Sequence, residues 1–270
     1  MKYKIGFNGY SEEQITPAEN NIERSEVTPV KSVVQVHFPS QGRSFSYYND
    51  RFDLHIGDTV FVDGKLEGVR GIVTDITYSF KIKLSDYKQV IAVADTCVKG
   101  EFHFAGSHLI AFNKNVIPYE KILGWVKAPE KDIETVRGKG DDDSFWLKNL
   151  SDFPIRHEVA DRGFDYYNAN KVIYLCLDGT EGKAIVDGTK VYEVEFDYND
   201  GEIRNIICDC FCSYHCKHEF AVLLQLRETL KIIEKNYPED YDNTYFAAIS
   251  KSVLLSYTMD SREKGSLILE

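Results

Sequence analysis

The feature that most constrains this chain is a run of metal-binding side chains between residues 208 and 218, in the stretch CDCFCSYHCKH. It holds four cysteines and two histidines: Cys208, Cys210, Cys212, His215, Cys216 and His218. Cysteines this close in sequence are better suited to a shared metal ion than to separate disulfide bridges. We therefore expect a metal site here and a reducing compartment around it.

The stretch divides into two ligand pairs. Cys208 and Cys210 follow the strand-like segment IRNII, and Cys216 and His218 precede a segment whose apolar residues have helical spacing. Zinc prefers four thiolate or imidazole ligands at the corners of a tetrahedron, so the two pairs must approach it from different directions. The five residues between the pairs, FCSYH, can form the necessary turn.

The segment from Arg162 to Leu230 resembles the SWIM zinc finger region of bacterial, stand-alone proteins, in which Cys-x-Cys, a spacer and Cys-x-His run directly into a helix. Upstream, RGFDYYNANKV and AIVDGTKVYEVEF are similar to the strands that precede the finger in bacterial members. The shared positions are Gly163, Tyr166, Tyr167, Val172, Gly188, Tyr192 and Val194. The resemblance implies that one zinc ion is bound by Cys208, Cys210, Cys216 and His218, and that the finger binds DNA or protein.

The spacer departs from the SWIM pattern, because Cys212 and His215 offer further donor atoms. A register that pairs Cys210 with Cys212 leaves three residues for the turn before Cys216, and it stays open as an alternative. We expect His215 to be a turn residue beside the site that hydrogen-bonds to a sulfur. Glu219 is expected to be either a surface glutamate or a first-turn helix glutamate that the helix dipole favours, and not a general base.

Four protein ligands leave no open position on the metal for water, which is typical of structural zinc. We therefore expect a structural ion and no enzyme activity. The chain also lacks the local motif of a serine hydrolase or of a phosphate-binding loop. The alternative is an enzyme with an unrecognised site between domains, although no small-molecule substrate is evident.

Charge and hydropathy bear on the compartment and the partner. No apolar run is long enough for a membrane span, so we expect a cytoplasmic protein without a membrane partner. The net charge of −11 argues against nonspecific coating of nucleic acid, so a nucleic-acid surface must be local. On the predicted helix from 217 to 235, Arg227, Lys231 and Lys235 form a basic stripe that Glu228 and Glu234 can neutralise.

Residues 32 to 97 predict a small β-barrel, either closed or half-closed. Alternating apolar residues in SVVQVHF, RSFSYY, DTVFV, GIVTDITYSF and QVIAVADT are separated by turn-forming residues. The stretch from Gly57 to Val73 resembles the KOW motif of ribosomal and transcription proteins, and we expect its four glycines at turns or close backbone approaches. In the loop of this stretch, the basic residues Lys65 and Arg70 are opposed by Asp63 and Glu67, which gives little support to RNA binding by this loop.

The remainder of the chain predicts an α+β fold. Residues 118 to 126 predict a short helix or strand that packs Trp125 on the barrel. An antiparallel β-meander is expected over 154 to 207, with hairpin turns at Asp178-Gly179, Asp187-Gly188 and Asn199-Asp200-Gly201. The zinc-anchored helix and a second amphipathic helix over 243 to 257 follow. We expect a barrel domain at 1–127, a linker at 128–153 and a SWIM zinc finger domain at 154–270.

Together these features predict a noncatalytic recognition or adaptor protein, in which structural zinc presents a surface to a macromolecule. DNA is the preferred partner, and a purely protein-binding module is the alternative. A continuous positive groove across the finger favours nucleic acid, an exposed apolar patch favours protein, and a deep polar pocket favours an enzyme.

Overall fold

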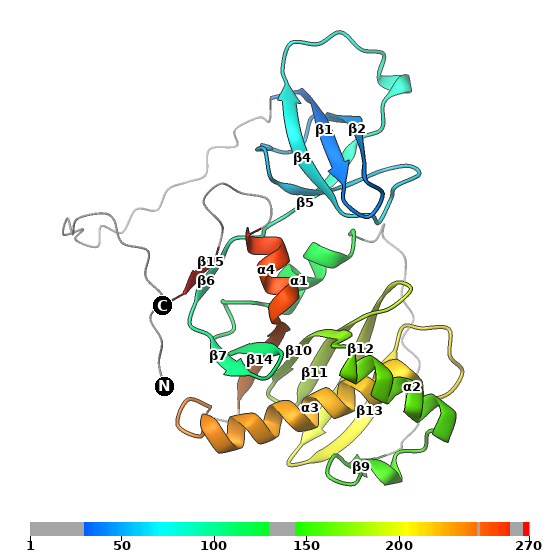
Figure 1. Cartoon of the computed structure of the whole chain (residues 1–270), viewed down its shortest axis with the longest axis vertical. Coiled ribbons are helices and arrows are strands. Elements are labelled where there is room, and N and C mark those ends of the chain that lie inside the picture. The colour runs from blue at the N-terminus through cyan, green and yellow to red at the C-terminus, as the bar shows by residue number, and fades with distance from the viewer. Residues whose placement is uncertain (1–29, 130–143, 242–243, 260–266, 270) are drawn as a thin grey trace, which may run out of the picture.

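The computed structural model describes residues 30–129, 144–241, 244–259 and 267–269. Within these ranges the chain has an α+β fold, as expected, with two antiparallel sheets, a short parallel strand pair and four α-helices. The smaller sheet is N-terminal, and the larger sheet lies among the helices in the rest of the molecule (Figure 1).

The N-terminal sheet has five strands in the order β2-β1-β4-β3-β5. They are β1 (Ser32–Phe38), β2 (Arg43–Asn49), β3 (Thr59–Val62), β4 (Gly71–Thr77) and β5 (Val90–Ala94), and the 3-10 helix η1 (Leu84–Asp86) precedes β5. In β1, fully buried Val34 and Val36 alternate with half-buried residues, because successive side chains of a strand point to opposite faces.

The predicted closure of this sheet into a barrel is not confirmed. In the described part of the chain, the edge strands β2 and β5 are joined by one isolated bridge between Tyr48 and Gln89, where Tyr48 N–H donates to Lys88 O at 2.9 Å. Strand β5 has five residues and pairs with β3, and no ladder joins it to β2 among the described residues. The result is an open, curved sheet around its own small core.

The four glycines of the KOW-like stretch are placed as expected. Gly57, Gly64 and Gly68 have φ of 91°, 91° and 80°, in the left-handed region that a side chain disfavours. Gly71 is needed for a close approach, since a Cβ there would lie 2.2 Å from Val36 Cγ1. The sequence therefore predicted these turns correctly, although the barrel that it also predicted is not confirmed.

The larger sheet has eight strands in the order β7-β8-β14-β10-β11-β12-β13-β9. Their bounds are β7 (His103–Ala105), β8 (His108–Ala111), β9 (Phe145–Trp146), β10 (Val172–Asp178), β11 (Glu181–Asp187), β12 (Val191–Asn199), β13 (Glu202–Cys208) and β14 (Tyr245–Ser250). The predicted meander is β10 to β13, and its last hairpin turns through Asp200 and Gly201 with φ of 48° and 96°. The parallel pair joins β6 (Val98–Gly100) to β15 (Leu267–Leu269).

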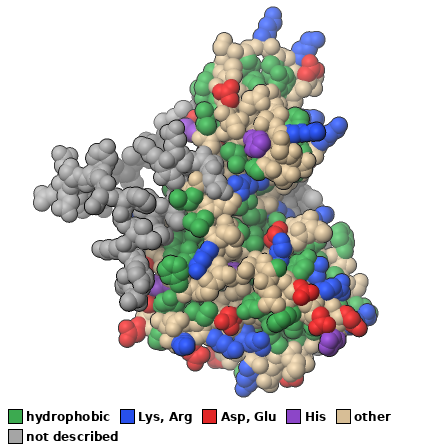
Figure 2. Space-filling model, in the orientation of Figure 1, with side chains coloured by type: hydrophobic (Ala, Val, Ile, Leu, Met, Phe, Trp, Pro, Cys, Tyr) green, Lys and Arg blue, Asp and Glu red, His purple; other side chains and the backbone are tan. Residues whose placement is uncertain are grey.

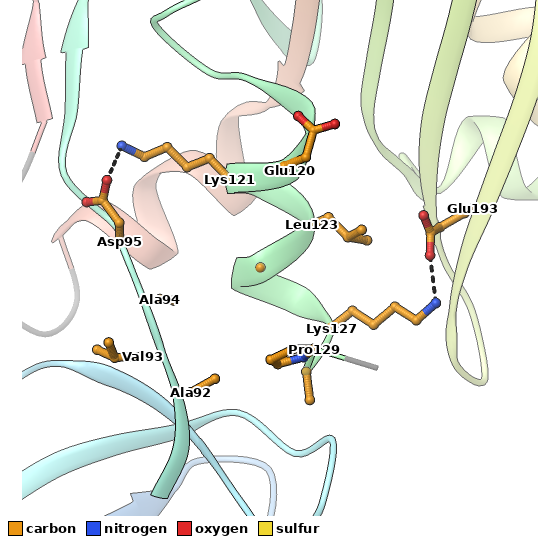
Figure 3. A pocket seen from close by; sticks show the side chains of 12 residues that line it. Ala92, Val93, Ala94, Asp95, Glu120, Lys121, Leu123, Lys127, Pro129 and Glu193 are labelled. Atoms are coloured by element: carbon orange, nitrogen blue, oxygen red, sulfur yellow. Dashed lines mark hydrogen bonds and ion pairs between the residues drawn. The ribbon is translucent and has the colours of Figure 1, made fainter. Parts of the chain in front are cut away.

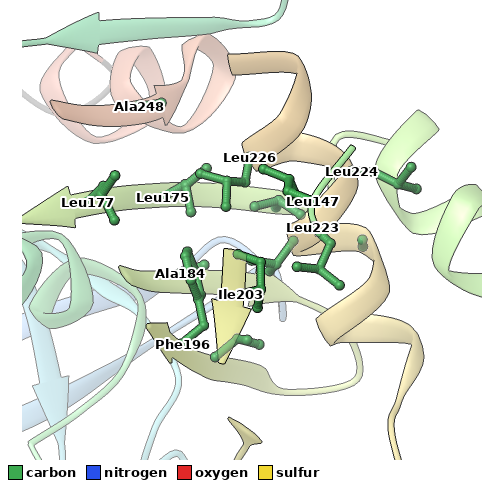
Figure 4. Close-up of a cluster of buried hydrophobic side chains, with 14 of the residues drawn as sticks. Leu147, Leu175, Leu177, Ala184, Phe196, Ile203, Leu223, Leu224, Leu226 and Ala248 are labelled. Atoms are coloured by element: carbon green, nitrogen blue, oxygen red, sulfur yellow. The ribbon is translucent and has the colours of Figure 1, made fainter. Parts of the chain in front are cut away.

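Helices cover both faces of the larger sheet (Figure 1). They are α1 (Tyr119–Val126), α2 (His157–Asn168), α3 (Lys217–Asn236) and α4 (Lys251–Met259), with the 3-10 helix η2 (Leu150–Asp152) before α2. Leu175 and Leu177 of β10 belong to the core under α3, shown in Figure 4, whereas Tyr174 and Cys176 belong to the core with α1 and α4. β10 is therefore apolar on both faces, as expected for a covered strand.

Two segments of the second half differ from the expected secondary structure. Residues 157–168, compared above with strands, form helix α2, and Gly163, Tyr166 and Tyr167 lie at helical spacing on the side toward α3. The predicted helix over 243 to 257 begins instead as strand β14 and becomes helix α4 at Lys251. All six residues of β14 are buried, so the helical spacing read from this segment does not reveal a central strand.

The boundary between the parts of the chain that form the two sheets does not fall at residue 127. Strands β7 and β8 and helix α1, from the segment assigned above to the N-terminal domain, pack with the larger sheet. Trp125 accordingly stacks on Tyr257 of α4, at 5.3 Å between ring centroids, and its Nε1 donates to Asp95 O just after β5. Strand β9, within the expected linker, pairs with β13, while residues 130–143 of that linker lie outside the described residues.

Candidate metal centre

The four residues paired in the sequence pattern lie together at the corner between β13 and α3. Cys208 is the last residue of β13, Cys210 lies in the following loop, Cys216 is the N-cap of α3, and His218 is in its first turn. Their ligand atoms all lie within 4.8 Å of one another. The cluster can hold a metal ion.

Two measured distances match the edges of a tetrahedral site. His218 Nδ1 lies 3.6 Å from Cys208 Sγ and 3.7 Å from Cys216 Sγ. Metal–sulfur and metal–nitrogen bonds of roughly 2.3 and 2.0 Å give tetrahedral edges of about 3.5 to 3.8 Å. Nδ1 is therefore the nitrogen placed to bind an ion.

Backbone N–H groups favour negative charge on the sulfurs. The N–H of Cys210 opposes the rise in the pKa of Cys208 that the Cys216 sulfur and burial cause, and the N–H of Cys212 opposes the rise that burial causes in the pKa of Cys210. At the helix start, Glu219 N–H donates to Cys216 Sγ at 3.5 Å. These donors, together with the positive end of the helix dipole, stabilise negative charge on sulfur.

The protein alone favours one thiolate in this cluster. A hydrogen bond from the Cys208 thiol lowers the pKa of Cys216 to about 4, and the same shared proton raises the pKa of Cys208. Burial raises the pKa of Cys210 to about 12. Three thiolates this close therefore need a cation to balance their charge.

Aromatic rings hold the imidazole of His218 in place. The ring of Tyr192, from β12, stacks on it with centroids 4.1 Å apart, and the ring of Tyr166, from α2, meets it edge-on at 5.4 Å. His218 is buried, and its Nε2 has no hydrogen-bond partner among the described residues. The packing thus fixes the ring with Nδ1 toward the sulfurs.

Glu219 lies in the first turn of α3, as one of the two alternatives predicted, but it is buried beside the cluster and is not a surface residue. Its carboxylate accepts hydrogen bonds from Cys216 N–H and from His215 Nδ1, both at 2.9 Å. Burial raises the pKa of Glu219, while the bond to His215 opposes that shift. The spacing Cys216-x-x-Glu219 was the sequence signal for this role, because it matches a capping box with cysteine in the place of serine or threonine.

Cys212 lies outside the cluster. Its side chain is exposed, and it is not among the four residues whose ligand atoms converge. The alternative register, in which Cys210 pairs with Cys212, therefore has no support in the geometry. The loop from 211 to 214 instead points its side chains to solvent, with Phe211 fully exposed and Tyr214 79% exposed.

A cavity of about 590 Å³ between β5 and α1 bears on the enzyme alternative (Figure 3). Much of its lining is apolar, and each of its charged side chains lies close to one of opposite charge. Lys121 lies 2.7 Å from Asp95, Lys127 lies 2.6 Å from Glu193, and Glu120 faces a lysine of β11 at 3.9 Å. This cavity therefore supports no assignment of a catalytic acid, base or nucleophile.

The basic stripe on α3 has Glu228 and Glu234 as neighbours in the sequence. Lys231 and Lys235 are exposed and Arg227 is half-buried, and in the described part of the chain none of them forms an ion pair with Glu228 or Glu234. On the face shown in Figure 2, however, basic and acidic side chains are interspersed, without a continuous positive groove. The basic stripe is therefore a local positive patch on α3.

No helix in the described ranges combines the length and the apolar character that a membrane crossing requires. No protein-family model, curated protein or solved structure matches this chain. The likeness to SWIM zinc fingers therefore depends on the ligand pattern and on the residues quoted with it.

Proposed function

We propose that Cys208, Cys210, Cys216 and His218 bind one zinc ion and that this ion is structural. A set of three soft sulfurs and one imidazole suits zinc at tetrahedral geometry. With four protein ligands, the ion has no position left for an activated water. Its task is then to hold the protein chain in place.

The ion would connect two elements that the chain joins by a loop. Cys208 ends β13, Cys216 and His218 begin α3, and Cys210 anchors the loop between them. Zinc ligation therefore fixes the angle at which α3 leaves the sheet. Without the metal, close sulfurs would lose their counter-charge, and the start of α3 would lose its anchor.

We further propose that the zinc-fixed corner presents a surface that binds nucleic acid, with DNA as the first candidate. The four-ligand cluster at the strand-to-helix corner is the observation that carries this proposal. The SWIM resemblance supports it, because such fingers are predicted to bind DNA or protein. The basic stripe along α3 supports nucleic acid in particular, because its Lys231 and Lys235 are exposed and phosphates attract exposed cations.

Metal analysis of the purified protein tests the first step. We expect one zinc ion per chain, and we expect Cys208→Ser and His218→Ala to release it. Retention of stoichiometric zinc in both variants would contradict the ligand assignment.

A fluorescence-anisotropy titration with single- and double-stranded DNA and RNA, at two salt concentrations, tests the second step. Lys231→Ala with Lys235→Ala should weaken binding and reduce its salt dependence. Lys65→Ala with Lys88→Ala, two exposed lysines near the N-terminal sheet, is a control of equal charge change. If the zinc-loaded protein binds none of these nucleic acids at low salt, the partner is a protein.

A further inference from the structure

We infer that the loop between Cys210 and Cys216 is a stacking platform for the bases of single-stranded nucleic acid, formed by Phe211 and Tyr214. The inference rests on the proposed function, because it takes nucleic-acid binding as given. It adds the surface that makes contact and the form of nucleic acid that fits it.

The exposure of the two rings is the first observation. Phe211 is fully exposed and Tyr214 is 79% exposed, although aromatic side chains usually bury most of their surface. The loop that carries them is not free to collapse, since a member of the metal cluster stands at each end. The two rings are thus held outward on a short, anchored loop.

Cations accompany the aromatic rings at this corner. The Arg156 guanidinium lies 5.7 Å from the centre of the Tyr214 ring, and Lys217 Nζ lies 4.3 Å from the centre of the Tyr166 ring. Aromatic faces combined with cations are the chemistry by which proteins hold single strands: bases stack on the rings and phosphates meet the charges.

The carboxylates next to the loop are engaged within the protein. Asp209 accepts a hydrogen bond from Glu193 N–H at 2.9 Å and lies 3.8 Å from Lys127 Nζ. Glu219 is buried against His215 and Cys216. Neither carboxylate is therefore directed at a phosphate that approaches Phe211 or Tyr214.

A single strand fits this surface better than a duplex does. In a duplex, the faces of the bases are covered by neighbouring bases, so exposed aromatic rings cannot stack on them. Duplex binding depends instead on many phosphate contacts. The interspersed charges in Figure 2 do not provide a continuous track for a duplex backbone on that face. The exposed rings and the cations at this corner therefore suit a single strand, which needs only a few stacked bases and a few phosphate contacts.

The test compares the zinc-loaded wild-type chain with Phe211→Ala/Tyr214→Ala, using a fluorescent mixed-sequence DNA oligonucleotide in single- and double-stranded form. Because both rings are exposed, zinc content and the circular dichroism spectrum should not change. Binding of the single strand should weaken by about 30-fold or more, since two stacking contacts are lost. Phe211→Trp/Tyr214→Trp should keep most of the affinity, whereas Phe211→Leu/Tyr214→Leu should not.

Trp146→Ala is the matched control, because Trp146 is also exposed and also has a cation, Lys148, 5.4 Å from its ring. It should leave affinity unchanged. The inference is overturned if the wild-type chain binds DNA but the double alanine variant binds equally well, or if the duplex binds as tightly as the single strand. If the wild-type chain binds no nucleic acid at all, the proposed function fails first, and the exposed rings would then be anchors for a protein.

Discussion

Cys216 and Glu219 cap each other in the first turn of α3. The sulfur of Cys216 accepts the Glu219 N–H at 3.5 Å, and the Glu219 carboxylate accepts the Cys216 N–H at 2.9 Å. Serine or threonine usually holds the first position of such a capping box. Here Cys216, a member of the candidate metal cluster, does so, and the proposed metal binding would therefore be coupled to the order of the helix start.

Removal of the Glu219 carboxylate should therefore weaken the helix start. Glu219→Ala leaves the buried N–H of Cys216 and the ring of His215 without their acceptor, and we expect the free energy of unfolding to fall by about 1 to 3 kcal/mol. Glu219→Gln keeps an acceptor oxygen and should lose less. Urea unfolding of the zinc-loaded variants measures both, and equal stability of the two would argue against the capping role.

The loop cysteines should differ in their effect on metal binding. Cys210→Ser removes a member of the converging cluster and should lower zinc affinity strongly, whereas Cys212→Ser changes an exposed side chain outside it and should not. Competition with a chromogenic chelator gives both affinities under the same conditions. Loss of zinc from Cys212→Ser alone would restore the alternative ligand register.

The candidate site was readable from sequence because its determinants are local. Cys208 ends a strand and Cys210 follows it in the loop, Cys216 and His218 lie at the start of a helix, and a short turn brings the two pairs together. The turns of the N-terminal sheet were readable for the same reason, as the positive φ of Gly57 shows. In both regions, residues close in sequence determine the geometry.

Features that depend on distant residues were not readable. Strand β14 looks like a helix in isolation and becomes a strand between β8 and β10, where both of its faces are buried. The burial of Glu219 depends partly on His215, whose ring packs on Phe153 at 4.4 Å. The tyrosine rings around His218 come from α2 and β12. No local sequence pattern predicts that these rings contact the histidine.

Gly163 sets how closely α2 approaches α3. A Cβ at this position would lie 2.9 Å from Lys217 O and 2.9 Å from the Phe220 side chain, so Gly163→Ala forces the helices apart. We expect a loss of about 1 to 3 kcal/mol from overpacking, although alanine favours the helix itself. The measurement is thermal or urea unfolding.

Gly124→Ala is the matched control, because Gly124 lies in helix α1 and a Cβ at this position would meet no described atom within 4 Å. That variant should gain up to about 1 kcal/mol from helix propensity alone. A stabilised Gly163→Ala would show that α2 can shift away from α3 without cost.

His108 should make stability depend on pH. Its Nε2–H donates to Val172 O at 2.7 Å, its Nδ1 accepts from the Ser107 hydroxyl at 3.0 Å, and the ring is fully buried. Burial lowers the pKa of His108, and nearby Lys251 lowers it further, against the effect of the bond to Val172. The folded state therefore prefers the neutral ring.

Because the unfolded chain binds this proton more readily, the contribution of His108 to stability is complete above about pH 6.5 and declines as the pH falls below that value. The slope is at most about 1.4 kcal/mol per pH unit. His108→Gln should be less stable at pH 7 and should also show a shallower decline between about pH 6.5 and 5. Urea unfolding across this range measures the slope, and identical slopes would exclude His108 as its source.

Arg70 should attach the N-terminal sheet to the rest of the molecule. Its guanidinium lies 4.0 Å from the centre of the Tyr257 ring, its Nη1 donates to Ser256 Oγ at 3.2 Å, and Tyr257 in turn stacks on Trp125. A partly buried cation–π contact of this kind contributes on the order of 1 to 2 kcal/mol. Arg70→Ala should therefore loosen the contact between the two sheets, and Tyr257→Phe should retain it.

Hydrogen exchange in α4 is the measurement. Exchange should rise in Arg70→Ala and stay near wild type in Tyr257→Phe. Unchanged exchange in both variants would show that other contacts hold the sheets together.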